Sequence, residues 1–215
     1  MNIKTVIFDL DGTLIDSRKD IAVAANKTLS ELNLPTLPEE TIASFIGGGV
    51  DILVKRCLGE QYIHMFDEVL QSYKKNYFQG CTVYTTLYPG VKEVLEFLKK
   101  RGIKTALATN KVISLSEKIL EHLGVKDYFD LMLGPEHVKN RKPNPEIINI
   151  LLEKLNKKPE DTLYVGDSNL DVLCGKNAGT YTCAVTYGIG SLESIIEADP
   201  DFIITDIKKL ILLLS

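Results

Sequence analysis

The segment VIFDLDGTLIDS, Val6–Ser17, joins a hydrophobic run to two closely spaced carboxylates. The apolar residues of 3–8 are typical of a buried strand, and Asp9 and Asp11 follow directly at its end. In an extended segment, residues i and i+2 point to the same side. The sequence therefore predicts a first strand that ends in two carboxylates lying side by side.

After about residue 87 the sequence alternates between helical and strand-like segments. Residues 91–102 show the pattern clearly, since apolar residues recur three and four apart and Gly102 follows a basic last turn. Expected strands lie at 103–110, 128–134, 162–167, 180–188 and 201–205, and expected helices at 91–102, 115–124, 144–156, 170–179 and 191–198. This βα alternation predicts the α/β class, with a Rossmann-like, mostly parallel sheet covered by helices on both faces.

Residues 17 to about 80 lack strand patterns and read as helices. Apolar residues from Ile21 to Leu32 share one helical face, and Thr36-x-x-Glu39 is expected to form a capping box at the start of another helix, with Pro38 in its first turn. We therefore expect two domains: a Rossmann-like core of residues 1–15 and 86–215, and an all-helical domain of residues 16–85 inserted after the first strand. The expected hinges are 14–17 and 83–88.

Composition limits the function classes. The chain has 215 residues, 45% of them hydrophobic, and a formal charge of −4. Such a chain can bury a substantial core, and it lacks the clustered Lys and Arg that nucleic acids or anionic membranes require. No segment resembles a signal peptide or approaches the roughly 18 apolar residues of a membrane span. We expect a cytoplasmic protein without nucleic-acid or membrane partners.

Charged and polar side chains stand where the expected parallel strands end. These are Asp9 and Asp11 after the first strand, Thr109 and Asn110 after the second, Asp167 and Asp171 after the strand at 162–167, and Lys142 in the loop NRKPNP. In open parallel sheets, ligands bind at the carboxyl ends of the strands. We therefore expect these residues to meet at one site.

So many carboxylates in one place need a counter-charge. Two like charges ~4 Å apart repel by about 4 kcal/mol at an effective dielectric constant near 20. Carboxylate oxygens without nitrogen or sulfur donors suit Mg²⁺, whose coordination is often completed by a substrate phosphate. The sequence thus predicts Mg²⁺ and, together with Lys142, a site for a phosphate dianion.

The Asp-x-Asp spacing has a chemical reading on such a site. Asp9 can attack phosphorus and form an aspartyl-phosphate, which divides one difficult displacement into two easier ones. Asp11 can protonate the leaving oxygen and then deprotonate the attacking water. Gly12 allows a tight turn whose N–H groups can hold phosphoryl oxygens.

The residues resemble the haloacid dehalogenase superfamily of phosphatases over essentially the whole chain. Its four motifs occur in order, as DLDGT from Asp9, LATN with Thr109, RKPNP with Lys142, and GDSNLD with Asp167 and Asp171. The resemblance also includes a helical cap inserted after the first motif. Since true dehalogenases lack an acid two residues after the nucleophile, Asp11 favours a phosphatase.

The resemblance implies a role for each matching residue. Asp9 is the implied nucleophile and a metal ligand, and Asp11 the acid/base, with its backbone carbonyl on Mg²⁺. The third protein ligand is then Asp167. The residues implied to bind the phosphoryl group are Thr109, the Asn110 amide and Lys142. The residues implied to support the metal site are Asp171 and Ser168.

Within the superfamily the sequence is most similar to the phosphoglycolate phosphatases, notably in FIGGGVDILVKRCLG and in VGDSNLDVLCGKNAG. The implied substrate is a small phosphorylated metabolite, 2-phosphoglycolate, and the protein a monomer or homodimer. In the cap, Gly48 within Gly47–Gly49 and Arg56 are candidates for specificity, because an arginine can bind a carboxylate bidentately. The glycines are equally explained by a turn, and Arg56 by a solvent-facing helix position.

Other functions remain open at this stage. Pyrophosphate or a sugar phosphate could be the substrate of the same chemistry, and a phosphosugar mutase shares the scaffold. A non-enzymatic phosphate-binding or receiver-like module also uses such a sheet edge. A receiver, however, is usually one domain of about 120 residues and has no use for a leaving-group acid or a helical lid.

Overall fold

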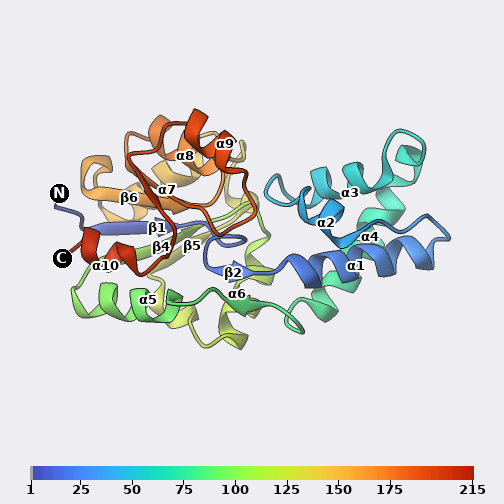
Figure 1. Ribbon diagram of the computed structural model, residues 1–215, viewed down its shortest axis with the longest axis horizontal. Coiled ribbons are helices and arrows are strands. Elements are labelled where there is room, and N and C mark those ends of the chain that lie inside the picture. The colour runs from blue at the N-terminus through green and yellow to red at the C-terminus, as the bar shows by residue number, and fades with distance from the viewer. Residues whose placement is uncertain (1) are drawn as a thin grey trace. The chain divides into compact units, whose positions relative to one another are not determined.

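The computed structural model describes residues 2–215 and divides into two compact units. One is formed by the chain up to Ile15 together with Leu87–Ser215, and the other is Asp16–Thr86. The first unit contains a six-stranded sheet with the order β5-β4-β1-β6-β7-β8, and every neighbouring pair is parallel (Figure 1). The expected α/β class with a parallel sheet is confirmed.

The strands of this sheet match the apolar runs of the sequence. They are β1 (Thr5–Phe8), β4 (Lys104–Ala108), β5 (Leu131–Leu133), β6 (Thr162–Gly166), β7 (Tyr181–Val185) and β8 (Phe202–Ile204). All four residues of β1 and all five of β6 are buried. Because strands covered on both faces favour apolar residues at nearly every position, these runs do not show a regular alternation with polar residues.

The helices of the first unit connect the strands and cover the sheet. They are α5 (Val91–Lys100), α6 (Ile113–His122), α7 (Glu146–Leu155), α8 (Asn169–Asn177), α9 (Leu192–Glu197) and α10 (Lys209–Leu213). On one face, Ile7 and Tyr164 pack with buried residues of α7 and α8, and α5 lies on the opposite side (Figure 1). The terminal helix α10 was not predicted from the sequence. Residues 2–215 also include four short 3₁₀ helices, at Ile63–Met65, Lys126–Tyr128, Pro135–His137 and Pro159–Asp161.

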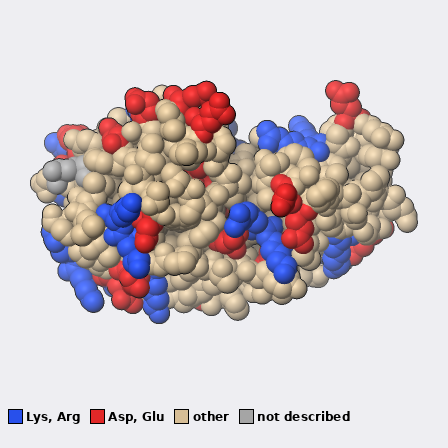
Figure 2. Space-filling view, in the orientation of Figure 1, with Lys and Arg blue, Asp and Glu red and all other residues tan. Residues whose placement is uncertain are grey.

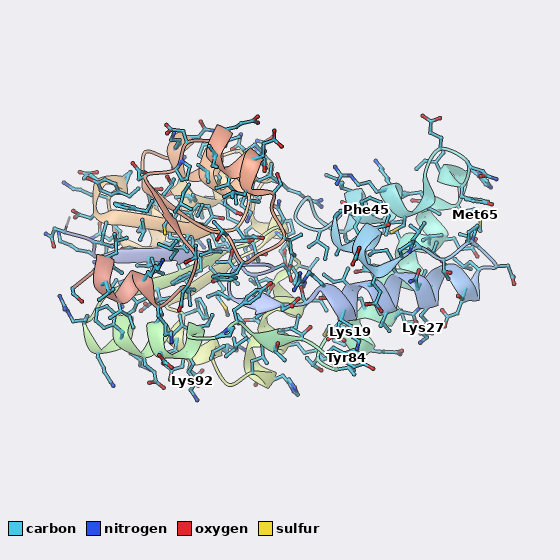
Figure 3. All side chains as sticks on the ribbon, viewed as in Figure 1. Lys19, Lys27, Phe45, Met65, Tyr84 and Lys92 are labelled. Carbon is cyan, nitrogen blue, oxygen red and sulfur yellow. The ribbon has the colours of Figure 1, made fainter. Side chains whose placement is uncertain are left out.

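The second unit is built on helices α1 (Arg18–Glu31), α2 (Glu39–Ala43), α3 (Val50–Leu58) and α4 (Phe66–Gly80). The apolar face expected for α1 is buried, and the Asn76 amide of α4 donates to Thr28 Oγ1 at 3.0 Å and to Glu31 at 2.8 Å. The Lys19 ammonium lies 4.0 Å from the Tyr84 ring centroid (Figure 3).

The expected capping box at Thr36–Glu39 was wrong. Helix α2 begins at Glu39, and Pro38 lies before it as the N-cap residue, without a side-chain cap bond. The segment that precedes α2 is held to α1, since the Asn26 side chain accepts from the Leu37 N–H at 2.9 Å and donates to its carbonyl at 2.8 Å. This contact fixes the approach to α2 without capping the helix.

The chain enters and leaves the second unit through a small ribbon that the sequence did not predict. Strand β2 (Ile15–Asp16) pairs with β3 (Thr86–Leu87). Nearby, the buried Asp20 carboxylate accepts the N–H groups of Tyr84 and Thr85 and the Thr85 hydroxyl. These bonds fix the first turn of α1 to the segment that leaves the unit.

Acidic and basic side chains are interspersed on the face shown in Figure 2. Within residues 2–215, no helix combines the length and the apolar character needed to cross a bilayer.

Candidate active site

Asp9 and Asp167 follow two adjacent strands at the centre of the sheet. Phe8 of β1 pairs with Val165 of β6, and the Asp9 N–H continues the ladder by donating to the Val165 carbonyl at 2.9 Å. The chain leaves β1 toward β4 on one side, whereas it leaves β6 toward β7 on the other. Such a reversal opens a crevice at the strand ends, and both carboxylates lie at it.

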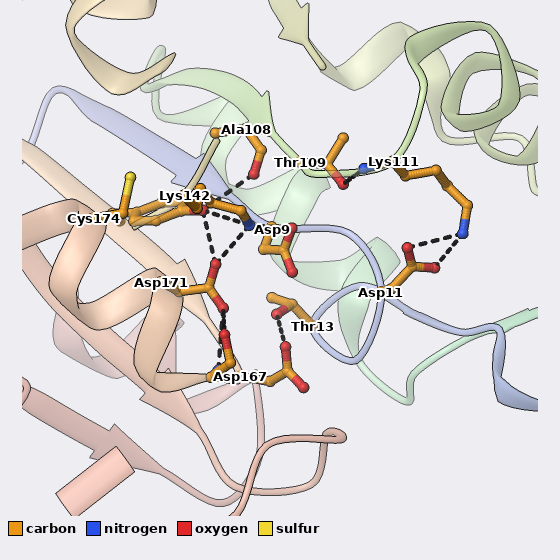
Figure 4. A network of polar contacts seen from close by, with 12 residues as sticks. Asp9, Asp11, Thr13, Ala108, Thr109, Lys111, Lys142, Asp167, Asp171 and Cys174 are labelled. Atoms are coloured by element: carbon orange, nitrogen blue, oxygen red, sulfur yellow. Dashed lines mark hydrogen bonds and ion pairs between the residues drawn. The ribbon is translucent and has the colours of Figure 1, made fainter. Parts of the chain in front are cut away.

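Lys142 reaches this point from the loop before α7, and its ammonium has three acceptors. It donates to Asp9 Oδ1 at 2.7 Å, to Asp171 Oδ1 at 2.7 Å and to the Tyr164 hydroxyl at 3.1 Å (Figure 4). The Lys142 side chain is only 3% exposed. Since an ammonium has three protons, these contacts satisfy it fully.

Helix α8 holds both Asp171 and the loop that carries Lys142. Asp171 Oδ2 accepts from the Ser168 N–H at 3.1 Å and from Ser168 Oγ at 2.6 Å. The Cys174 thiol donates to the Asn144 carbonyl at 3.2 Å, beside Lys142. Both Asp171 oxygens are thus engaged by protein groups, which fits it to hold Lys142 rather than to contact a ligand.

A loop after β7 surrounds Asp167. Asp167 Oδ2 accepts the N–H groups of Ile189 and Gly190 at 2.6 and 3.2 Å, and Oδ1 lies 3.3 Å from Thr13 Oγ1. A Cβ at Gly12, Gly188 or Gly190 would overlap Asp167. Glycine is therefore required at these positions because the backbone approaches the carboxylate closely.

The buried carboxylates carry perturbed pKa values. Removal from water raises the pKa of Asp9 to about 8, with Asp171 and Asp167 adding to the rise and Lys142 opposing it. Burial likewise raises the pKa of Asp167 to about 7, and Asp171 adds to it. Burial alone would lower the pKa of Lys142, but Asp171 and Asp9 raise it above its ordinary value. When ionised, the three carboxylates Asp9, Asp167 and Asp171 carry more negative charge than the single positive charge of Lys142 can balance.

The same cluster has the composition of a metal site. One oxygen each of Asp9, Asp167 and Asp171 lies within 4.8 Å of the other two, and all three residues are buried. A divalent cation would offset the negative charge of these carboxylates, whose repulsion adds to the burial that raises the pKa values of Asp9 and Asp167, and a set of carboxylate oxygens suits a hard ion. The Asp11 side chain is not part of this cluster.

Asp11 instead forms an ion pair with Lys111, a residue that the sequence analysis did not single out. Thr109, Asn110 and Lys111 follow β4, and Thr109 and Asn110 are buried. The Lys111 ammonium donates to the two Asp11 oxygens at 2.7 and 2.8 Å, and Figure 4 shows this carboxylate turned toward Lys111. Asp9, Asp167, Lys142 and Asp171 are therefore brought together, whereas the Asp11 carboxylate has a separate partner.

Tyr164 was also missed. It is one of the largest fully buried side chains, and the sequence marks it only as an apolar position within β6. Its hydroxyl lies 3.1 Å from the Ala108 carbonyl oxygen and 3.0 Å from Asp171 Oδ1, in addition to Lys142. A tyrosine in place of an aliphatic residue, three positions before Asp167, was the available signal.

The two specificity candidates lie in the second unit. Gly48 is half-buried, and the nearest atom to a Cβ there would be the terminal methyl of the Ile52 side chain. Arg56 is exposed on α3, with its guanidinium 5.8 Å from the Phe45 ring centroid. Their part in specificity stays a prediction.

Comparison with known proteins agrees with this geometry. The family model described as haloacid dehalogenase-like hydrolase matches residues 6–185. The chain belongs to this family. Among relatives of this hydrolase, a phosphoglycolate phosphatase from Aquifex aeolicus (strain VF5) is 40% identical over 212 residues, covering 99% of this chain and 97% of the relative. Another, from Vibrio parahaemolyticus, is 38% identical over 217 residues, covering 98% and 95%.

Solved structures show the same fold for this haloacid dehalogenase-like hydrolase. A crystal structure of a predicted phosphoglycolate phosphatase from Haemophilus somnus 129PT has a TM-score of 0.95 at 31% identity, covering 100% of this chain and 99% of that one. The expected enzyme class, a phosphoric monoester hydrolase of this family, is confirmed.

Proposed function

We propose that the enzyme is a Mg²⁺-dependent phosphatase that hydrolyses a small phosphomonoester, 2-phosphoglycolate, through an aspartyl-phosphate on Asp9. The convergence of Asp9, Asp167 and Lys142 at the strand ends carries the proposal. The phosphoglycolate phosphatases that are similar to this chain over nearly its whole length support the choice of substrate.

Asp9 and Asp11 divide the chemistry between them in this proposal. An Asp9 oxygen forms a bond to phosphorus while the bond from phosphorus to the leaving oxygen breaks, and Asp11 gives that oxygen a proton, so that glycolate departs. Water then attacks phosphorus, Asp11 takes its proton, and the phosphate that leaves restores the Asp9 carboxylate. Asp11 must turn from Lys111 to face the leaving oxygen.

The remaining residues bind and orient. Lys142 and Asp171 fix the nucleophile, because the Lys142 ammonium holds Asp9 Oδ1 and is itself held by Asp171. Thr109 and the Asn110 amide would hold phosphoryl oxygens beside it, and Ser168 steadies Asp171. Asp9, Asp167 and the Asp11 backbone carbonyl would hold Mg²⁺, which neutralises negative charge on the phosphoryl group.

The helical unit Asp16–Thr86 is proposed as the cap, with Gly48 and Arg56 contributing to specificity. Its insertion between β1 and α5 and the paired strands at its two ends support this role. A cap that closes over substrate would exclude water from the reaction.

A turnover panel tests the proposal. Phosphate release is measured from 2-phosphoglycolate, pyrophosphate and glucose 6-phosphate with Mg²⁺ and with excess EDTA. We expect the highest kcat/KM on 2-phosphoglycolate, and loss of turnover in EDTA and in Asp9→Asn. A preference for pyrophosphate or the sugar phosphate would reject the substrate while retaining the chemistry. Full activity in EDTA would reject the metal.

A further inference from the structure

Lys111 lies at the edge of the sheet where the proposed phosphate contacts are. It follows Thr109 and Asn110 at the end of β4, and its N–H donates to Thr109 Oγ1 at 3.1 Å. Strand β4 is the direct neighbour of β1, which carries Asp9 and Asp11. The Lys111 ammonium is thus placed beside the proposed acid rather than on a remote surface.

The Lys111–Asp11 pair is largely withdrawn from solvent. The two side chains are 7% and 12% exposed, and the ammonium contacts both carboxylate oxygens. Two charges withdrawn from water lose their hydration, and a close, well-oriented ion pair compensates for part of that loss. The fold therefore maintains a buried positive charge at this position and balances it with Asp11.

The proposed reaction requires this pair to separate at least partly. Asp11 must face the leaving oxygen, and both of its oxygens are at present within 2.8 Å of Lys111. A buried ammonium that loses such a contact needs another anion in its place. The candidate that arrives at that moment is the substrate.

The chemistry of the leaving group supplies such an anion. In 2-phosphoglycolate the carboxyl carbon is two covalent bonds from the oxygen that leaves phosphorus. A cation that touches the acid for that oxygen is consequently within reach of the carboxylate. Charge-assisted contacts of this kind are shorter and about twice as strong as neutral hydrogen bonds.

We infer that Lys111 binds an anionic group on the alcohol side of the substrate, exchanging Asp11 for it, and so selects phosphate esters of hydroxy acids over those of neutral alcohols. This inference rests on the proposed function. It differs from a role in which Lys111 only positions Asp11, because that role would serve every phosphate ester equally.

A matched pair of substrates separates the two roles. Ethyl phosphate has the two-carbon skeleton of 2-phosphoglycolate without its carboxylate. In Lys111→Met we expect kcat/KM for 2-phosphoglycolate to fall at least tenfold further than kcat/KM for ethyl phosphate, mainly through KM, and Lys111→Arg to restore part of the difference. Lys104→Met is the control, since Lys104 pairs with Asp130 at the other end of β4. It should leave both values unchanged.

Each failure has its own signature. Equal loss on both esters in Lys111→Met overturns the inference and leaves Lys111 as a positioning residue for Asp11. Wild-type enzyme alone provides a second measurement, since equal kcat/KM on the two esters also overturns it even where Lys111→Met does not fold. A wild type that releases phosphate from neither ester overturns the proposed function itself.

Discussion

Two lysines at the same sheet edge are held in different ways. Lys142 donates to two carboxylates and a tyrosine hydroxyl, and its partners are in turn bound by Ser168 and the Ala108 carbonyl. The Lys111 ammonium instead donates to both oxygens of the Asp11 carboxylate. In the proposed mechanism, this difference separates a nucleophile that has to be fixed, Asp9, from an acid that has to move, Asp11. A network suits the first requirement and an exchangeable pair the second.

Removal of the nucleophile should have the largest effect. In Asp9→Asn the side chain keeps its shape but cannot attack phosphorus. We therefore expect kcat to fall by roughly 10³-fold or more, as it does when other enzymes lose a nucleophile that works together with neighbouring catalytic residues. Single-turnover phosphate release is the measurement. Residual activity above a tenth of wild type would show that Asp9 is not the nucleophile.

Substitution of each lysine allows a direct comparison of how strongly Lys142 and Lys111 stabilise the fold. Lys142→Met leaves two buried carboxylates without their shared cation, and we expect the free energy of unfolding to fall by about 3–5 kcal/mol. We expect a smaller loss, about 1–2 kcal/mol, for Lys111→Met, since the change removes the ion-pair partner of one carboxylate, Asp11, rather than of two. Urea denaturation in EDTA measures both. Equal losses would remove the distinction between a fixed and an exchangeable lysine.

Tyr164→Phe tests whether the tyrosine hydroxyl helps to hold Lys142 and Asp171 in place. The change deletes one hydroxyl that contacts Lys142, Asp171 and Ala108, and leaves their buried polar groups short of a partner. We expect a loss of about 1–3 kcal/mol of stability and a kcat lowered about tenfold with KM nearly unchanged. Tyr181→Phe, at a partly exposed position of β7, serves as the control. A KM effect without a kcat effect would contradict a positioning role.

The smallest expected effect concerns the loop after β7, which contacts Asp167. Gly188→Ala introduces a methyl group that overlaps Asp167 and the Gly12 carbonyl oxygen. We expect the Mg²⁺ concentration that half-maximally raises the thermal unfolding midpoint to increase several-fold, because Asp167 is displaced. Gly80→Ala, whose Cβ meets nothing within 4 Å at the end of α4, is the control and should leave this midpoint response unchanged. An unchanged response in Gly188→Ala would remove the loop from the site.

Much of the fold and of the site could be predicted from residue patterns. Apolar runs that end in Asp9, Thr109 and Asp167 identify parallel strands and their carboxyl ends, and these ends must lie on one edge. The sequence did not identify Lys111 and Tyr164 as site residues, for a physical reason. A lysine that follows a strand is typically solvent-exposed, and a tyrosine within a buried strand is typically part of the hydrophobic core. Only the folded geometry shows that each reaches a partner from another strand.

The loop after β7 shows a second limit of prediction from the sequence. Gly188 and Gly190 read as ordinary turn residues, because glycine spacing does not reveal which carboxylate the backbone N–H groups approach. The helical unit shows a third limit, since the segment before α2 is held by Asn26 of α1 rather than by a capping bond from Thr36. In both cases the deciding contact joins segments that are distant along the chain.

The central place of β1 in the sheet has a consequence for biosynthesis. Strand β1 pairs with β4 on one side and with β6, which begins only at Thr162, on the other. A nascent chain therefore carries Asp9 through most of translation without Asp167 or Asp171. On the proposed mechanism, a chain that ends before β6 lacks Asp167 and would not release phosphate from an ester.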